Sequence, residues 1–346
     1  MKTKRSTLCD EKQMARRCSC RRPSVMATQS LPVANARVSS LGLSIVAAFY
    51  IAIVPNTATA TEGGGTSKAL GVDNVMAGIM PPPGLQLTNF LAFYTAGHTL
   101  DSSGNDRAGL SNFDLFVTAE TLRFRYVWPG VKLFGADVET RVGFNAVTDV
   151  DVSFNVQTPF GRFHREDSTT AVGDALLGVI LGWHSKRFHQ MLGPEFFLPT
   201  GDFDKNRLAN TGRGYYAIGP SYWFTWFPID EIEVSGALIY LINFENPDTN
   251  YSSGHELSFD YLLGYELTRG WQIGANGYLY KQIMDDEQNG RVVGDGNRGQ
   301  VVAVGPFIRY HPSKNWGITL KWQHEELVEN RPSGERIFLQ VMVQFF

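Results

Sequence analysis

Apolar and polar residues alternate one by one through most of the chain after residue 84, and this pattern restricts the fold more than any other feature. In residues 255–267 (HELSFDYLLGYEL), apolar residues such as Leu257 and Phe259 alternate with polar residues such as Glu256 and Ser258. A period of two places the two sets on opposite faces of a β-strand. The last stretch of the chain, RIFLQVMVQFF, repeats the pattern, and no stretch shows a convincing helical period. The sequence therefore predicts an all-β fold.

The connections between the expected strands alternate in length. Tight turns are expected near 128–131, 184–187, 227–231, 268–270 and 311–315, and long polar loops near 97–112, 159–169, 200–214, 245–254, 285–299 and 327–335. If residues 131–158 form one long strand, tight turns would lie on one rim and long loops on the other. Outer-membrane barrels have short periplasmic turns and longer outer loops. We therefore expect residues 85–346 to form a transmembrane antiparallel β-barrel of about 12 strands in the bacterial outer membrane.

Tryptophan positions support this interpretation. Five of the seven tryptophans lie within about three residues of an expected tight turn, and they are Trp128, Trp183, Trp226, Trp271 and Trp316. Tryptophan favours the membrane–water boundary because its ring is amphipathic. We expect an aromatic girdle on the rim that carries the tight turns. A soluble sandwich with core tryptophans is the alternative, but it would not collect them at one rim.

The polar face of the expected strands carries charges of both signs. Such charges suit a water-filled lumen, where they would set the selectivity of a pore. They could also pair across neighbouring strands and serve the structure alone. The candidates for the lumen are Arg123, Arg125, Asp137, Glu139, Arg141, Glu195, Glu256, Asp260, Glu266 and Lys321.

The N-terminal region has the features of a secretory signal peptide. Residues 41–55 are apolar but shorter than the roughly 20 residues that a membrane helix needs. Ala58-Thr59-Ala60 matches an A-x-A cleavage site. We expect residues 1–60 to be cleaved, with Met26 as an alternative start. All three cysteines precede Ala60, so the mature chain needs no disulfide.

The predicted mature chain is acidic. Nine of the 31 Lys and Arg and two of the 34 Asp and Glu lie in residues 1–60, which leaves a formal charge of -10. An acidic chain argues against nucleic-acid binding, which usually needs a basic patch. Residues 61–84 form a Gly/Pro-rich stretch, for which we expect a role as a lumen plug or as a periplasmic lead.

Residues 199–216 (PTGDFDKNRLANTGRGYY) form the most polar of the expected outer loops. Asp202, Asp204 and Asn206 resemble the start of a calcium loop, but Arg207 and Arg213 stand where an EF-hand has its Gly and Glu. We expect these charges to pair and to hold the loop folded over the entrance of the pore. The outer-loop candidates are Asp202, Asp204, Lys205, Asn206, Arg207 and Arg213.

Two further motifs resemble chemical sites without completing one. Residues 294–299 (GDGNRG) match G-x-G-x-x-G, but a strand follows them where the dinucleotide motif needs a helix. His184 and Ser185 suggest a hydrolase pair, although adjacent residues of a strand point to opposite faces. The histidines show no zinc-binding spacing. We therefore expect no catalytic, cofactor-binding or metal-binding residues, and the protein is not expected to be an enzyme.

Several blocks of the chain resemble one bacterial family. GDALLGVILGWH, FFLPTGDFDKNRLANTGRGYY, INFENPDTNYSSGHELSFDYLLGYEL, GDGNRGQVVAVGPFIRY and ENRPSGERIFLQ look like the outer-membrane family labelled "putative meta-pathway of phenol degradation". The blocks run from about Gly173 to Phe346 in the order of the family, and residues before about 113 match only loosely. The resemblance implies a transport barrel linked to aromatic catabolism, with no catalytic residues.

The resulting expectation is an outer-membrane channel for passive uptake of small, hydrophobic or aromatic compounds. Its partners would be outer-membrane lipid, the solute, and the barrel-assembly machinery, which recognises aromatic-terminated last strands such as FLQVMVQFF. Nucleic acid is not an expected partner. Two alternatives are a surface adhesin or structural barrel with a plugged lumen, and an outer-membrane hydrolase.

Overall fold

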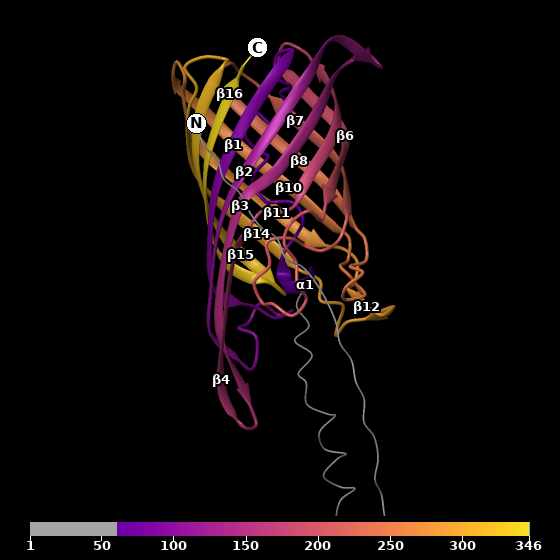
Figure 1. The fold of residues 1–346 in the computed structure, drawn as a ribbon. Coiled ribbons are helices and arrows are strands. Elements are labelled where there is room, and N and C mark those ends of the chain that lie inside the picture. The colour runs from indigo at the N-terminus through magenta and orange to yellow at the C-terminus, as the bar shows by residue number, and fades with distance from the viewer. Residues whose placement is uncertain (1–60, 346) are drawn as a thin grey trace, which may run out of the picture. The chain divides into compact units, whose positions relative to one another are not determined.

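The structure, a computed structural model, describes residues 61–345. The expected signal peptide, residues 1–60, lies outside this range. Among the described residues the one helix is α1 (Thr61–Gly64), and no helix is long and apolar enough to cross a membrane. The rest of the described chain is strands and loops (Figure 1).

Twelve strands form a closed antiparallel barrel, as the alternating pattern predicts. β1 pairs with both β2 and β16, and this double pairing closes the sheet. The barrel strands are β1 (Gly84–Thr99), β2 (Leu110–Leu133), β3 (Ala136–Thr158), β5 (Ala175–His184), β6 (Phe188–Leu198), β7 (Ala217–Trp226), β8 (Ile232–Asn243), β10 (Glu256–Thr268), β11 (Trp271–Gln282), β14 (Gln300–Tyr310), β15 (Trp316–Glu329) and β16 (Pro332–Gln344).

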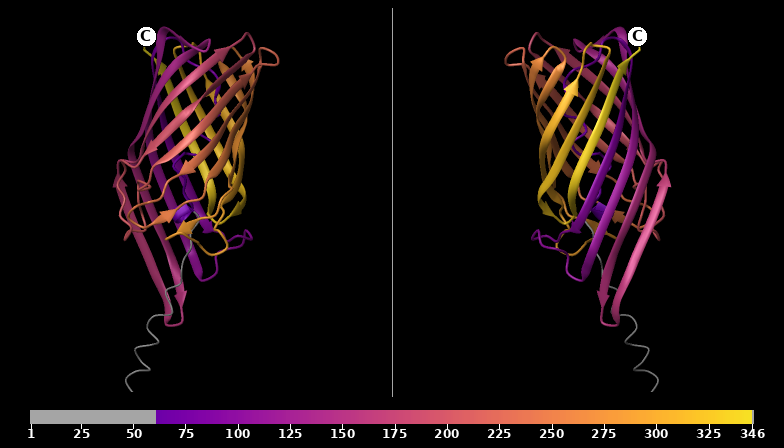
Figure 2. Two further views of the ribbon diagram at one scale, coloured as in Figure 1. Left: turned by 90° about the vertical axis from the view of Figure 1, so that its right-hand side faces the viewer. Right: turned by 90° about the vertical axis from the view of Figure 1, so that its left-hand side faces the viewer.

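The remaining strands lie outside the barrel wall. β4 (Gly161–Ala171) pairs with the second half of β3, whose first half pairs with β5. β3 and β4 therefore extend beyond the rim that carries the long loops (Figure 2). Three two-residue strands in these loops form a small separate sheet, and they are β9 (Tyr251–Ser252), β12 (Glu287–Gln288) and β13 (Arg291–Val292).

The first tight turn was placed wrongly by the sequence. Pro129 and Gly130 remain inside β2, where the pairing with β3 is interrupted between Val127 and Lys132. The chain turns instead at Phe134 and Gly135, which both have positive φ (52° and 75°). Two residues with positive φ match the twist of a two-residue hairpin. The long strand accordingly runs from 136 to 158, and the Pro-Gly pair marks an irregularity rather than a turn.

Two of the expected long loops are also wrong. Residues 161–171 form β4, and residues 329–332 form a tight turn, because β15 ends at Glu329 and β16 starts at Pro332. In both segments polar residues occupy consecutive positions. Neither segment therefore has the apolar face by which the other strands were recognised. The other tight and long connections fall where the alternation places them.

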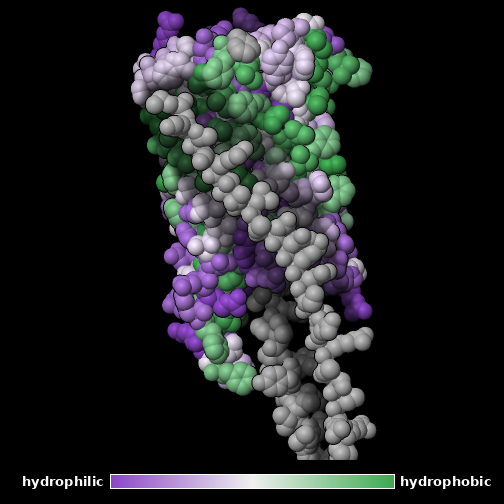
Figure 3. Space-filling view, viewed as in Figure 1, coloured by the Kyte–Doolittle hydropathy of each residue, from purple (hydrophilic) through white to green (hydrophobic). Residues whose placement is uncertain are grey.

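The outward face of the barrel wall is largely apolar and the inward face is largely polar, as expected. Leu263, Tyr265 and Leu267 are about half exposed on the outside, whereas Asp260 is fully buried in the interior. On the face seen in Figure 3, apolar residues gather in the part of the barrel nearer the tight turns, and polar residues dominate the other end. An apolar outer band with a polar interior is the arrangement of an outer-membrane barrel. The chain is therefore an outer-membrane β-barrel.

Candidate functional site in the barrel interior

The interior of the barrel holds residues 61–83, which we call the N-terminal segment. At the long-loop end, Glu62 accepts hydrogen bonds from Asn246 Nδ2 (3.0 Å) and Thr249 Oγ1 (2.5 Å). At the tight-turn end, the Gly78 N–H donates to Thr225 Oγ1 (3.0 Å), next to the end of β7. The segment therefore runs through the interior from one rim toward the other before β1 begins.

Asp260 on β10 binds the N-terminal segment at three points. Its two carboxylate oxygens accept hydrogen bonds from the Gly71 N–H (2.8 Å) and the Asp73 N–H (3.0 Å). Lys68 Nζ lies 2.9 Å from the same carboxylate. Since a buried carboxylate is costly unless it is paired and hydrogen-bonded, these three contacts account for its burial.

Lys321 on β15 binds the same turn from a different part of the wall. Its ammonium group donates to the carbonyls of Gly71 (2.8 Å) and Val72 (3.1 Å) and to Asn74 Oδ1 (2.9 Å). It also lies 4.8 Å from the centroid of the Phe338 ring. The turn at residues 71–74 is thus held by a buried anion and a buried cation.

A second group of charges joins β2, β3 and β6. Glu139 accepts hydrogen bonds from Arg125 (2.6 Å) and Arg141 (3.0 Å), and Arg141 also binds Glu195 (2.9 Å). Arg123 forms an ion pair with Asp73 of the N-terminal segment. Most lumen candidates therefore bind one another or the N-terminal segment, rather than facing an open channel.

Three lumen candidates lie apart from this central group. Glu256, at the long-loop end of β10, accepts hydrogen bonds from Thr66 Oγ1 (2.5 Å) and Asn243 Nδ2 (2.9 Å). Asp137 pairs with Lys132 at the tight-turn rim, where both side chains are accessible to water. Glu266 accepts a hydrogen bond from the Gly270 N–H in a tight turn. Asp137 and Glu266 therefore bind partners at the tight turns and not in the barrel interior.

Sequence reasoning missed several interior residues. Lys68, Asp73 and Asn74 carry no periodic signal, because the N-terminal segment is not a strand. Others could have been found by continuing the alternation of charged and polar residues along β8, β11, β14, β15 and β16. They are Glu233, Asn276, Arg309, Gln323, Glu325 and Arg336, all of which make interior hydrogen bonds.

The outer loop at 199–216 is fixed mainly by backbone hydrogen bonds. Asp174, between β4 and β5, accepts hydrogen bonds from the Gly201 N–H and the Arg213 N–H (both 2.9 Å). Burial raises the pKa of Asp174 above its usual value. Asp167 on β4 accepts from the Ala209 N–H (3.1 Å) and the Leu208 N–H (2.8 Å), and these hydrogen bonds hold its pKa below the usual value.

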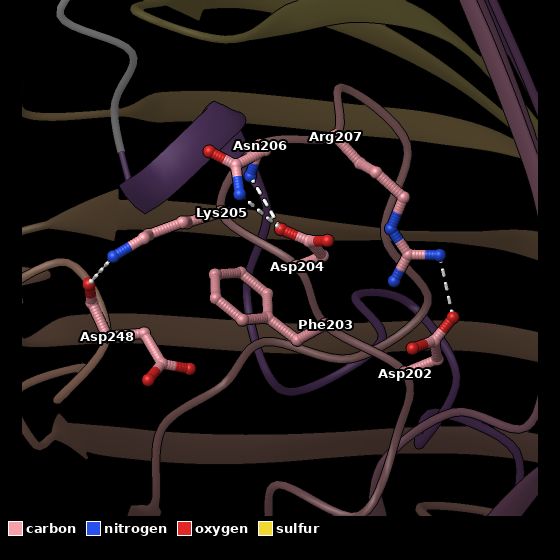
Figure 4. A pocket seen from close by; sticks show the side chains of 7 residues that line it. All are labelled: Asp202, Phe203, Asp204, Lys205, Asn206, Arg207 and Asp248. Carbon is pink, nitrogen blue, oxygen red and sulfur yellow. Dashed lines mark hydrogen bonds and ion pairs between the residues drawn. The ribbon is translucent and has the colours of Figure 1, made fainter. Parts of the chain in front are cut away.

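The charged side chains of this loop line a cavity of about 450 Å³ (Figure 4). Arg207 pairs with Asp202 (2.7 Å), and Asp204 accepts from the backbone N–H (2.9 Å) and Nδ2 (3.0 Å) of Asn206. Lys205 reaches instead to the carbonyl of Asp248 in the next loop (3.2 Å). Within residues 61–345 no cluster of His, Cys, Asp or Glu has the arrangement of a metal site.

The two residues of the suspected hydrolase pair do not contact each other as a dyad. Ser185 Oγ donates to the Phe188 carbonyl (2.8 Å) inside a tight turn. His184 Nδ1 lies 3.2 Å from His189 Nδ1. The geometry needed for a base-activated serine is therefore not formed by these residues.

Four tryptophans of the expected girdle, Trp183, Trp226, Trp271 and Trp316, lie at the ends of strands next to tight turns, whereas Trp128 lies inside β2, before the turn at Phe134 and Gly135. Trp128, Trp226, Trp271 and Trp316 are each more than two-fifths exposed. Trp271 and Trp316 both pack on Tyr310, and the indole N–H of Trp183 donates to the Phe134 carbonyl (3.2 Å). These rings form an outward-facing group on the tight-turn rim.

Comparison with solved structures shows the same fold. An outer membrane channel from Pseudomonas putida F1 aligns with a TM-score of 0.65 at 13% identity, over 80% of this chain and 100% of that chain. The CymD monoaromatic hydrocarbon channel aligns less closely, with a TM-score of 0.40 at 7% identity over 78% of this chain and 90% of that chain. None of the curated proteins matches.

One protein family matches most of the chain. Its profile, described as "Putative MetA-pathway of phenol degradation", covers residues 96–341. The match begins well before Gly173, where the recognisable sequence blocks start, and it spans nearly all of the barrel. The chain therefore belongs to this family.

Proposed function

We propose that this protein is an outer-membrane channel for passive uptake of small hydrophobic or aromatic compounds that feed aromatic catabolism. One observation carries the proposal: the interior is filled by residues 61–83, a segment bound by side chains and not by a strand ladder. Such a segment can leave without opening the barrel wall. A barrel whose interior stays closed could be filled by side chains of its own wall, without a separate segment that can leave.

The description of the family and the fold of its structural relative support this function. The family's description refers to phenol degradation, and the relative from Pseudomonas putida F1 is an outer membrane channel. Passive diffusion needs no cofactor, and the proposal assigns none. The proposal also includes the C-terminal strand β16 as the segment that the assembly machinery recognises.

In the proposed mechanism the N-terminal segment is the plug. Lys68, Leu70 and Asn74 are almost completely buried, so the described conformation is closed. Release of the turn at 71–74 would expose Arg123, Arg125, Glu139, Arg141, Asp260 and Lys321 to the lumen. These charges would then set selectivity. The loop at 199–216 would shape the entrance, since its Lys205 contacts the loop that binds Glu62.

Single-channel recording in planar bilayers tests the proposal. We expect the wild type to open rarely and a variant lacking residues 66–79 to open steadily with a larger conductance. Deletion of residues 202–213 serves as the matched control, and it should change the entrance without holding the channel open. Heat-modifiable migration on a gel reports that each variant has folded as a barrel.

A structural or adhesin barrel with a permanently plugged lumen is the second candidate. The complete burial of the interior favours it over any enzyme. It predicts that the wild type never opens, although the variant lacking residues 66–79 conducts. This result would overturn the channel.

A further inference from the structure

The interior wall carries buried charges together with local clusters of apolar residues. Charged residues of β2, β8, β10, β15 and β16 bind the N-terminal segment. The inward residues of β5–β8 are of both kinds. The polar ones are Glu195, Ser221, Thr225, Glu233 and Ser235. The buried apolar residues among them are Ile180, Met191, Phe197, Ala217, Trp223, Ala237, Ile239 and Leu241. Apolar clusters therefore stand beside the buried charges of the lumen.

The apolar residues of β5–β8 form two clusters. Phe197, Ala217 and Leu241 form one cluster. A side chain added at Gly219 would meet Ile239, Leu241 and Phe197 within 3.5 Å, so these residues converge where β7 has no side chain. Beyond this point a second cluster contains Ile180, Met191, Trp223 and Ala237.

Met80 of the N-terminal segment packs into the second cluster. Met80 and Ala77 pack among these residues and Val127 of β2. A Cβ added at Gly182 would lie 2.7 Å from the terminal methyl of Met80, so the methyl occupies the space left by this glycine. A flexible thioether is suited to fill an irregular apolar site and to leave it again.

The same cluster contains a polar group without a partner. Trp223 is 1% exposed, and its indole N–H makes no hydrogen bond with any residue in the described part of the chain. The guanidinium of Arg141 lies 4.8 Å from the centre of the indole ring but is paired with Glu139 and Glu195. A buried donor without an acceptor costs free energy, and each such case calls for an explanation.

We propose that Met80 occupies a binding site for a small uncharged aromatic compound that carries an acceptor oxygen, such as a phenol. The ring would replace the Met80 side chain among Ile180, Met191 and Ala237, and its oxygen would accept from the Trp223 N–H. A dry apolar cavity of about 150 Å³ is sufficient to bind benzene. The inference rests on the proposed channel and names its solute class.

The first test follows the methionine methyl groups of the full protein in lipid nanodiscs by NMR, with phenol or toluene added. We expect the Met80 and Met191 signals to shift saturably with both solutes, because both residues line the site. The signal of Met284, which is exposed in an outer loop, should not move. If Met80 and Met191 do not respond at saturating solute, the site does not exist.

The second test separates a recognition role of Trp223 from simple packing. Trp223→Phe keeps a ring but removes the donor, so phenol should bind about five- to tenfold more weakly while toluene changes less than twofold. Trp226→Phe, on the outward face of the same strand, is the matched control and should change neither. Equal loss of phenol and toluene binding, or no loss of either, would overturn the role of the indole N–H.

A third measurement checks the occupancy by Met80 itself. Met80→Ala should bind both solutes at least tenfold more tightly, because the competing side chain is gone, whereas Met284→Ala should match the wild type. Unchanged affinity in Met80→Ala contradicts the proposal. If these binding results hold but the variant lacking residues 66–79 does not conduct, the channel fails and the binding site remains. If the wild type opens and the binding results fail, the channel stands without this site.

Discussion

Asp260 and Lys321 bind the same residue from different strands: the Gly71 N–H donates to Asp260, and Lys321 donates to the Gly71 carbonyl. Both side chains are fully buried. The two opposite charges therefore hold one turn of the N-terminal segment at its amide and at its carbonyl. We call this arrangement the latch.

Loss of the latch should open the channel. Hydrogen bonds to a charged group contribute about 1.5–3 kcal/mol each. A change of about 1.4 kcal/mol alters an equilibrium tenfold. Lys321→Met should therefore raise the open fraction in planar bilayers at least tenfold. Asp137→Asn, which alters a pair at the rim, is the control and should match the wild type. A closed Lys321→Met channel would show that the latch does not hold the segment.

A methyl group added at Gly71 should also release the N-terminal segment, without removing a charge. Gly71 has a φ of 74°, and an added Cβ would lie 2.3 Å from Gln323 Oε1. Gln323 cannot move freely, because it is buried and bound to the Gly71 carbonyl and to Asn276. We expect Gly71→Ala to make the N-terminal segment sensitive to added protease in folded barrels. Gly97→Ala, where an added Cβ meets nothing within 4 Å, should remain resistant.

Removal of Glu139 should destabilise the barrel strongly. This buried carboxylate is shared by Arg125 and Arg141, and breaking a buried ion pair on one side costs about 3–5 kcal/mol. The free energy of unfolding of Glu139→Gln, measured in urea with lipid vesicles, should fall by about this amount. Asp137→Asn, at a surface pair, should change it by less than about 1 kcal/mol. Similar values for the two variants would contradict a structural role for Glu139.

Two carboxylates that hold the outer loop should titrate on opposite sides of the usual Asp value of about 3.9. Burial raises the pKa of Asp174, and hydrogen bonds from the Ala209 and Leu208 amides lower that of Asp167. Amide chemical shifts followed by NMR should therefore change at higher pH for Gly201 and Arg213 than for Leu208 and Ala209. The reverse order would contradict this assignment.

The two shifts have opposite consequences for stability. A lowered folded pKa means that Asp167 stabilises the loop above its unfolded pKa, and that this contribution is lost as pH falls through the folded value. A raised folded pKa means that the charged form of Asp174 disfavours the fold at neutral pH, and that this cost disappears as pH falls through the folded value. A fall in pH should therefore weaken the hydrogen bonds from the Leu208 and Ala209 amides to Asp167 rather than strengthen them. Asp167→Asn should already weaken their protection against amide exchange at neutral pH.

The sequence by itself determined the barrel, because a period of two records which residues face lipid and which face inward. It could not fix every boundary. Pro129-Gly130 looked like a turn, but the strand continues to Leu133, since the favoured two-residue hairpin turns need positive φ at their first position and Pro cannot provide it. β4 was hidden because a strand that stands in water on both faces has no apolar period.

The placement of the N-terminal segment was decided by the tertiary structure alone. Lys68, Asp73 and Gly71 carry no pattern, and their partners Asp260 and Lys321 lie 187 to 250 positions further along the chain. The alternation showed that Asp260 and Lys321 point inward, but it could not show what they bind. Only the closure of twelve strands brings these two charges to the same turn, because a buried charge must find its partner in space and not in sequence.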